Sequence, residues 1–206
     1  MKNTRVKILE AALDLFNEHG MVNVSLRQIA QALKISQGNL NYHFKLKEDI
    51  VEALYFQLVS EMDAQMNALE NAENELTSLY EISLKTMEKM YEYKFILIDF
   101  IHLMKENKNI KSHYTKLMQF RNEQFQYIFQ SMVNSRLLRK EEFQNEYQRL
   151  YKRMNILGDS WINVKLTFEP NNDLKYYCDL LFETIYPYLT TKGKEAYRNI
   201  SYLELQ

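Results

Sequence analysis

Residues 24–48 read Val-Ser-Leu-Arg-Gln-Ile-Ala-Gln-Ala-Leu-Lys-Ile-Ser-Gln-Gly-Asn-Leu-Asn-Tyr-His-Phe-Lys-Leu-Lys-Glu, and this is the most informative stretch of the chain. It holds two short helical patterns, each preceded by a serine whose side chain can accept a hydrogen bond from the first turn of a helix. Ser25 and Gln28 have the spacing of a capping box, and Ser36 is the expected N-cap of the second helix. These signals predict two short helices joined by a tight turn.

Each of these helices has one face suited to a core. Leu26, Ile29, Ala30 and Leu33 recur at core spacing on the first, and Leu40 and Phe44 do so on the second. The rest of the second helix carries amide side chains and one phenol: Gln37, Asn39, Asn41 and Tyr42. Amides hydrogen-bond the edges of DNA bases, and basic residues nearby contact phosphates. The pattern therefore indicates a helix-turn-helix, at about residues 25–44, that reads double-stranded DNA.

Residues 4–50 as a whole resemble the DNA-binding domain of the TetR/AcrR family of bacterial repressors. The ordered set of motifs and its spacing carries the resemblance: Phe16-Asn17-Glu18-His19-Gly20, Val24-Ser25, Ile29-Ala30, Ile35-Ser36-Gln37-Gly38-Asn39-Leu40, Tyr42-His43-Phe44-Lys45 and Lys47-Glu48-Asp49-Ile50. The resemblance implies a sequence-specific transcriptional regulator, of the repressor type, that binds a palindromic operator as a homodimer and is released by a small-molecule effector.

The resemblance also assigns roles to single residues. Gln37, Asn39, Asn41 and Tyr42 would face the major groove, and Gly38 would let the helix approach the DNA backbone closely. Arg27, His43 and Lys47 would hold phosphates. For any one of these residues the alternative is a solvated polar group on the surface, and for the helix pair as a whole it is a structural motif that never meets DNA.

Two positions depart from the family pattern. Lys34 stands in the turn where the family usually has glycine, and a positive φ there would cost lysine roughly 1 kcal/mol relative to glycine. Asn41 stands where the family most often has tyrosine, so the contact made at this position is expected to differ. Both departures concern the operator sequence rather than the fold.

Composition favours an all-α fold. The 206 residues include only four glycines and two prolines, whereas a sheet protein needs many turns and turns depend on these residues. Apolar periodicity predicts helices over residues 4–19, 47–69, 74–91, 93–106, 110–138, 141–168 and 173–189, with a polar boundary at 70–75, an end of the regular pattern at Gly193 and a short helix within 194–205. We expect a three-helix head at residues 1–48 and a helical ligand-binding and dimerisation body at residues 49–206.

Charge distribution and cysteine content indicate which end of the chain meets DNA and in which compartment the protein resides. Residues 1–50 contain seven Lys or Arg and five Asp or Glu, a net charge of +2, and the remainder carries −3, so basic residues lean toward the expected DNA end. A single cysteine, Cys178, allows no internal disulfide. There is no signal-peptide pattern and no apolar run long enough to span a bilayer. We expect a cytoplasmic protein without membrane contact.

The body is rich in methionine and aromatic residues, which suit an adaptable apolar cavity. The candidates for a pocket that binds a small hydrophobic effector are Met87, Tyr91, Met118, Arg121, Phe125 and Trp161. Arg121 could orient an anionic ligand. The alternative for the apolar residues is ordinary core packing, and for Arg121 a salt bridge at the surface.

The predicted helix at residues 173–189 is apolar over more than one of its faces, including Tyr177, Leu181 and Ile185. A helix of this kind is buried on two sides. Contact with a second subunit and simple burial within one chain both explain the pattern. We expect a dimer interface, because a palindromic operator requires two heads.

The sequence predicts no catalytic residues, no metal site and no cofactor. The four histidines lack metal-ligand spacing, and no phosphate-binding loop or hydrolase motif is present. Two alternatives to the effector-released repressor remain open: a DNA-binding regulator whose body binds a protein partner and has no small-molecule pocket, or a small enzyme fused to a DNA-binding head.

Overall fold

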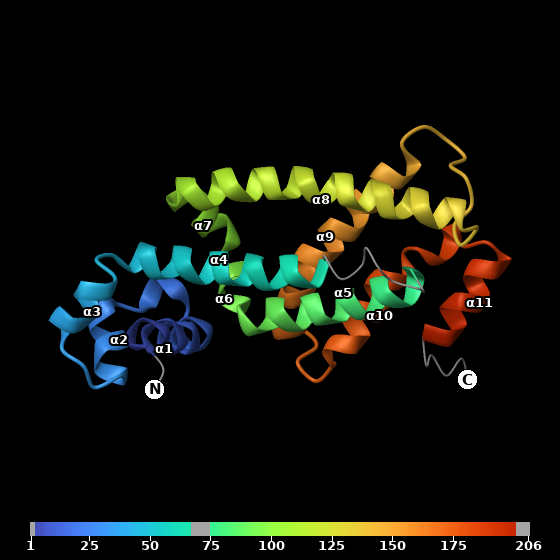
Figure 1. The fold of residues 1–206 in the computed structure, drawn as a ribbon. Coiled ribbons are helices and arrows are strands. Elements are labelled where there is room, and N and C mark those ends of the chain that lie inside the picture. Colours follow the sequence, from blue (N-terminus) through green and yellow to red (C-terminus); the bar gives the residue numbers. More distant parts are fainter. Residues whose placement is uncertain (1–2, 67–74, 201–206) are drawn as a thin grey trace. The chain divides into compact units, whose positions relative to one another are not determined.

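Helices make up most of the computed structural model, which describes residues 3–66 and 75–200 (Figure 1). Within these residues the chain forms no strand, only an isolated antiparallel bridge between Leu138 and Leu189. The all-α prediction is therefore confirmed. Contacts divide the chain into an N-terminal unit, Met1–Met62 with Lys89–His113, and a C-terminal unit, Asp63–Glu88 with Tyr114–Gln206. This division follows packing, and a functional boundary after residue 48 stays a prediction.

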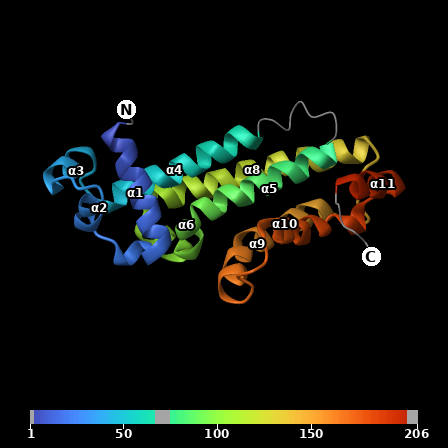
Figure 2. The same cartoon turned by 90° about the horizontal axis from the view of Figure 1, so that it is seen from below.

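The N-terminal unit begins with α1 (Thr4–His19), α2 (Leu26–Ala32) and α3 (Gln37–His43), which lie together beside the start of α4 (Lys47–Met66) in both ribbon views (Figures 1 and 2). The end of α5 (Glu75–Glu92), α6 (Lys94–Ile98), α7 (Phe100–Glu106) and the start of α8 (Lys108–Asn134) complete it. Its core holds Ile8, Ala12, Phe16, Ile29, Leu40, Phe44, Ile50 and Leu54, each less than 5% exposed.

The single helix predicted over residues 93–106 is wrong, because the chain leaves helical geometry at Asp99 and forms α6 and α7 instead. The Asp99 carboxylate accepts a hydrogen bond from the Met21 amide at 3.1 Å. Met21 opens a short 3₁₀ turn, Met21–Asn23, that follows α1. Asp99 thus ties the α6–α7 break to the end of α1, a contact between residues 78 positions apart that no local pattern reveals.

The C-terminal unit contains the rest of α8, then α9 (Glu146–Thr167), α10 (Leu174–Glu183), a 3₁₀ turn (Tyr186–Tyr188) and α11 (Thr191–Ile200). The predicted helix over 173–189 is too long, since regular geometry stops at Glu183 just before the turn that contains Pro187. Gly193 does not end the pattern but lies inside α11. The predicted ends at residues 69 and 205, and most of the boundary at 70–75, fall outside the described residues.

α9 starts at Glu146 and not at the predicted residue 141, and a buried ion pair lies at this start. The Glu146 side chain is almost fully buried and accepts two hydrogen bonds from Arg139, at 2.7 and 2.9 Å, and one from the Glu142 amide at 2.8 Å. The hydrogen bonds from Arg139 lower the pKa of Glu146 to about 2. Asn145, directly before α9, has a φ of 61°, in the left-handed region, and this interrupts helical geometry. The Glu146 network ties residues 139 and 142 of the preceding loop to the first residue of α9.

Gly193 is required by close packing. A Cβ built on it would lie 2.1 Å from the Leu137 carbonyl oxygen, a distance that real atoms do not adopt. Gly193→Ala is therefore expected to destabilise the protein by about 1–3 kcal/mol, as overpacked sites do. Urea denaturation would measure this. Gly158→Ala in α9 is the matched control, because nothing lies within 4 Å of its Cβ position, and it should be neutral or stabilising by up to about 1 kcal/mol. Equal effects of the two changes would contradict the packing argument.

Candidate nucleic-acid interface

The sequence predicts the caps of α2 and α3 correctly. Ser25 and Gln28 form a reciprocal capping box, in which the Ser25 amide donates to Gln28 Oε1 at 2.8 Å and the Gln28 amide donates to Ser25 Oγ at 3.3 Å. Ser36 Oγ accepts a hydrogen bond from the Asn39 amide at 3.1 Å. These bonds satisfy backbone donors that helix starts leave unpaired. They fix where the seven-residue α3 begins, and therefore which of its side chains point outward.

Lys34, in the turn between α2 and α3, has a φ of 54°. This is the left-handed region that the glycine of the family pattern adopts easily and that a side chain makes costly. The amides of Leu33, Lys34 and Ile35 still find carbonyl acceptors within α2, so the turn keeps its shape with lysine in place. Lysine in place of glycine thus raises the conformational free energy of the turn, while the backbone hydrogen bonds of the turn are formed.

Lys34→Gly is expected to raise the free energy of unfolding by about 1 kcal/mol, because glycine relieves the strain at positive φ. Denaturant titration of the two proteins at equal concentration measures the change. Gln31→Gly, inside α2, is the control and should cost up to about 1 kcal/mol, since glycine weakens a helix interior. A loss of stability in Lys34→Gly would contradict the account of the turn.

The outer face of α3 brings together the residues predicted to read bases. Gln37, Gly38, Asn39, Asn41 and Tyr42 are all exposed, and Tyr42 is 86% exposed, whereas Leu40 on the opposite face is fully buried. An aromatic ring left so open in a short helix contributes nothing to the core. His43 is half-buried and its ring lies edge-on to that of Tyr42, with centroids 5.2 Å apart.

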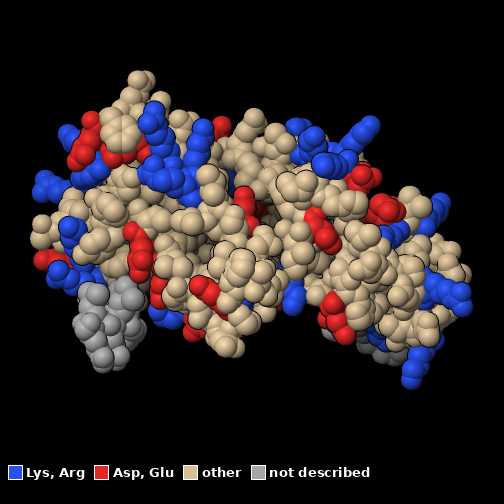
Figure 3. Space-filling model, turned by 180° about the vertical axis from the view of Figure 1, so that it is seen from behind, with Lys and Arg blue, Asp and Glu red and all other residues tan. Residues whose placement is uncertain are grey.

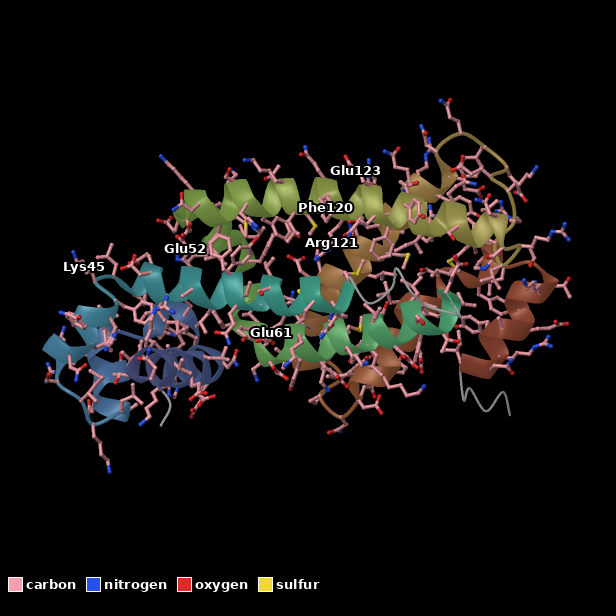
Figure 4. All side chains as sticks on the ribbon, viewed as in Figure 1. Lys45, Glu52, Glu61, Phe120, Arg121 and Glu123 are labelled. Atoms are coloured by element: carbon pink, nitrogen blue, oxygen red, sulfur yellow. The ribbon has the colours of Figure 1, made fainter. Side chains whose placement is uncertain are left out.

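Basic side chains flank this face. Arg27, Lys34 and Lys45 are exposed, and Lys45 extends from the turn between α3 and α4 (Figure 4). Figure 3 shows Lys and Arg atoms at the right-hand edge, where α1–α3 lie. Lys47 is half-buried and donates one hydrogen bond to the Met21 carbonyl at 3.0 Å. Because an ammonium has three donors, Lys47 can bind the Met21 carbonyl and still donate hydrogen bonds to a phosphate.

Sequence reasoning missed two residues that hold the head in place within the N-terminal unit. Asn17, in α1, donates to the Glu92 carbonyl at 2.7 Å and accepts from the Phe95 amide at 3.1 Å, so its amide group joins the end of α5 to the start of α6. Asp99 makes the contact with Met21 described above. Asn17 belongs to a recognisable motif, but nothing in the sequence indicates partners 75 residues away.

The residues predicted to line an effector pocket are placed as follows. Met87, Arg121 and Trp161 are buried, and Tyr91, Met118 and Phe125 are half-buried. All belong to the C-terminal unit except Tyr91. Arg121 forms an ion pair with Asp63 and donates to Gln124 Oε1 at 2.7 Å. It lies on the side of α8 opposite Glu123 (Figure 4). Arg121 thus forms a salt bridge, which was the alternative to a role in ligand binding, but its own side chain is buried and only that of Asp63 is exposed.

Apolar side chains are left exposed along α9 and α10. Of the residues predicted at a dimer interface, Tyr177 and Ile185 are buried within the single chain and Leu181 is half-buried. Tyr177 packs against Trp161 of α9, with ring centroids 5.6 Å apart. The assignment of these three to an interface stays a prediction. The exposed apolar residues of this region are Ile156, Leu157, Val164, Leu166, Phe168, Tyr176 and Leu180.

Two family models match the chain. One described as "Bacterial regulatory proteins, tetR family" covers residues 8–54, and one described as "Bacterial transcriptional repressor" covers residues 57–197. HTH-type transcriptional regulators of Staphylococcus aureus strains USA300 and NCTC 8325 are 30% identical over 93 residues, which is 45% of this chain and 49% of each relative. The chain therefore aligns with about half the length of these curated relatives.

Solved structures share the fold. A TetR-family transcriptional regulator from Marinobacter aquaeolei VT8 superposes with a TM-score of 0.83 at 22% identity, covering 97% of this chain and 98% of that one. A transcriptional regulator from Saccharomonospora viridis in complex with choline gives 0.73 at 22% identity, with 89% and 95% covered. The SmeT–triclosan complex gives 0.66 at 15% identity, with 93% and 94% covered. Within the described residues, no helix has the length and apolar character needed to cross a membrane.

Proposed function

Because the chain belongs to the TetR family of bacterial transcriptional repressors, we propose that it binds a palindromic operator as a homodimer and is released by a small hydrophobic effector. The observation that carries this proposal is the outer face of α3. Its amide side chains and its phenol are exposed, lie on the opposite side of the helix from the buried Leu40, and are flanked by exposed cations. Bidentate amide contacts suit adenine, and the phenol suits a phosphate or a thymine methyl.

Two copies of this face must reach successive major grooves, so the α3 helices of the operator-bound dimer should lie roughly 34–36 Å apart. The exposed apolar residues of α9 and α10 support a second subunit in this account, since apolar residues grouped on neighbouring helices mark association surfaces. α4 begins at the head with Lys47 and runs into the C-terminal unit as far as Met66. A shift of α4 would alter the head spacing.

Leu180→Glu is expected to weaken the dimer at least tenfold, because it places an unpaired carboxylate in an apolar interface. Sedimentation over a range of protein concentrations would show a shift toward monomer. Tyr127→Glu, at a 77% exposed position on α8, is the control and should leave the dimer intact. A Leu180→Glu protein that dimerises like the wild type would contradict the proposed surface.

An effector site within the C-terminal unit is supported by Gly158. Gly158 is half-buried and nothing lies within 4 Å of its Cβ position, while its neighbours one turn away on the same face of α9, Met154 and Trp161, are buried. Open space beside a tryptophan and a methionine suits an apolar ligand. Choline and triclosan occur in complexes of proteins with this fold. An effector that favours the non-binding state by about 1–3 kcal/mol would be a useful switch.

A reporter gene downstream of an operator fragment tests the direction of regulation. Transcription is expected to fall when the protein is co-expressed in a bacterial cell and to recover when a hydrophobic effector enters. Unchanged transcription, or a rise, would contradict repression. The effector mechanism predicts that operator binding weakens in vitro with some small hydrophobic compound, or in the Gly158→Leu protein, whose side chain would fill the space beside Trp161. If neither weakens binding, we would infer instead that the body binds a protein partner.

A further inference from the structure

A concave site lies in the C-terminal unit, at the loop that joins α8 to α9 in Figure 1. Its volume is about 940 Å³, within the range of small-molecule sites. It is lined by the last turns of α8, by loop residues 136–145 and by the first turn of α9. None of the six residues predicted for an effector pocket lines it, so this site is separate from the predicted effector pocket.

The site carries positive charge that its surroundings do not neutralise. Arg136 and Lys140 line it, and neither forms an ion pair within the described part of the chain. The nearby Arg139 differs, because Glu146 and Glu142 pair with it. The one carboxylate that lines the site belongs to Glu141, and it already accepts a hydrogen bond from the Tyr147 amide at 2.9 Å. The lining thus holds two cations and one carboxylate, and both cations are available to an anionic group because neither is paired with a carboxylate of the described residues.

The remaining lining is rich in amides. Three glutamines and two asparagines contribute to it. Gln126 lines the site, and its Nε2 is buried without any hydrogen-bond partner among the described residues. A buried polar atom without a partner is costly, and a rotation of this amide toward an acceptor of a bound molecule would remove that cost. Phe129 and Tyr147 form the apolar floor, with ring centroids 5.4 Å apart.

Unpaired cations, several amide groups and an aromatic floor together define the ligand. A carboxylate or phosphate would meet Arg136 and Lys140, hydroxyl groups would exchange hydrogen bonds with the amides, and an apolar ring face would rest on the floor. We propose that this site binds a small hydroxyl-rich anion, either a sugar phosphate or a sugar acid. The proposal does not rest on DNA binding or on the effector mechanism.

Titration calorimetry of the full-length protein at about 0.15 M salt tests this site, with glucose 6-phosphate, glucuronate, neutral glucose and inorganic phosphate as probes. At least one anionic sugar is expected to bind at least tenfold more tightly than glucose or phosphate, and comparison of the two anionic sugars identifies the charged group. Arg136→Gln with Lys140→Gln should weaken that binding at least tenfold, and Gln126→Leu should weaken it also. Lys152→Gln, an exposed cation of α9 outside the site, is the matched control and should bind like the wild type.

Thermal denaturation of the unliganded variants ensures that altered binding does not reflect unfolding. Three results would overturn the proposal: failure of both anionic sugars to bind the wild type at millimolar concentration, binding of inorganic phosphate as tight as that of the anionic sugars, or equal binding by the Lys152→Gln and Arg136→Gln/Lys140→Gln proteins. The measurement needs no DNA, so its failure is distinct from any failure of operator binding.

Discussion

Replacing Asn39 and Asn41 together by alanine is expected to remove most of the protein's preference for its operator over random DNA. Both side chains are exposed on the outer face of α3, where an amide can form two hydrogen bonds with an adenine. Each such contact discriminates against the wrong base by about 1–3 kcal/mol. The double variant should therefore lose about twice this free energy of binding to the operator and almost no free energy of binding to random DNA.

Fluorescence anisotropy with a labelled operator duplex and a random duplex, at several salt concentrations, measures this difference. The salt dependence should not change, because it reports phosphate contacts and the variants keep every cation. Gln57→Ala, which removes an exposed amide from α4, is the control and should bind both duplexes normally. An equal loss of affinity for the two duplexes would show that the asparagines do not read bases.

Arg139→Met is expected to lower the free energy of unfolding by about 3 kcal/mol, because it leaves the Glu146 carboxylate buried without its cation. The side chain of Glu146 is 3% exposed and that of Arg139 is 27% exposed, which places the cost at the lower end of the range for buried pairs. Urea denaturation at pH 7 measures the loss. Arg139→Met with Glu146→Leu, which removes both charges, should recover most of it.

The same pair predicts a pH dependence. Hydrogen bonds from Arg139 hold the pKa of Glu146 at about 2 in the folded protein, below its ordinary value of 4.5. A carboxyl whose pKa is lowered by folding stabilises the protein above its unfolded pKa, and this contribution is lost as the pH falls through the folded value. Wild-type stability from this source should decline between about pH 4.5 and pH 2. If the Arg139→Met/Glu146→Leu protein declined by the same amount over that range, other carboxyls would be responsible.

Local sequence signals predicted the DNA-binding head in detail. The Ser25 and Ser36 caps depend on residues three positions away, and the burial of Leu40 and Phe44 follows from the helical period within one short segment. The cost at Lys34 could be anticipated because the family pattern has glycine there, and the observed φ of 54° agrees. In each case the physical cause lies within a few residues of its effect.

Features that depend on distant partners could not be predicted in this way. The partner of Asp99 at the α6–α7 break is Met21, 78 positions away. The late start of α9 depends on the pairing of the Glu146 and Arg139 side chains, which helical periodicity does not indicate. Periodicity shows that a helix such as α10 is apolar on several sides, but it does not say which side faces the rest of its own chain. The sequence therefore does not indicate that Tyr177 and Ile185 are buried within the chain while Tyr176 and Leu180 are exposed.

Selection of bacterial genomic fragments by the purified protein at near-physiological salt, followed by sequencing, would show whether a dimer reads its operator through α3. We expect a few fragments to be enriched and to share an inverted repeat, as two α3 helices on a dimer require. The Asn39→Ala/Asn41→Ala protein, run in parallel, should not enrich them. Uniform recovery of all fragments by the wild type, or enriched fragments without a repeat, would contradict a dimeric regulator that reads its operator through α3.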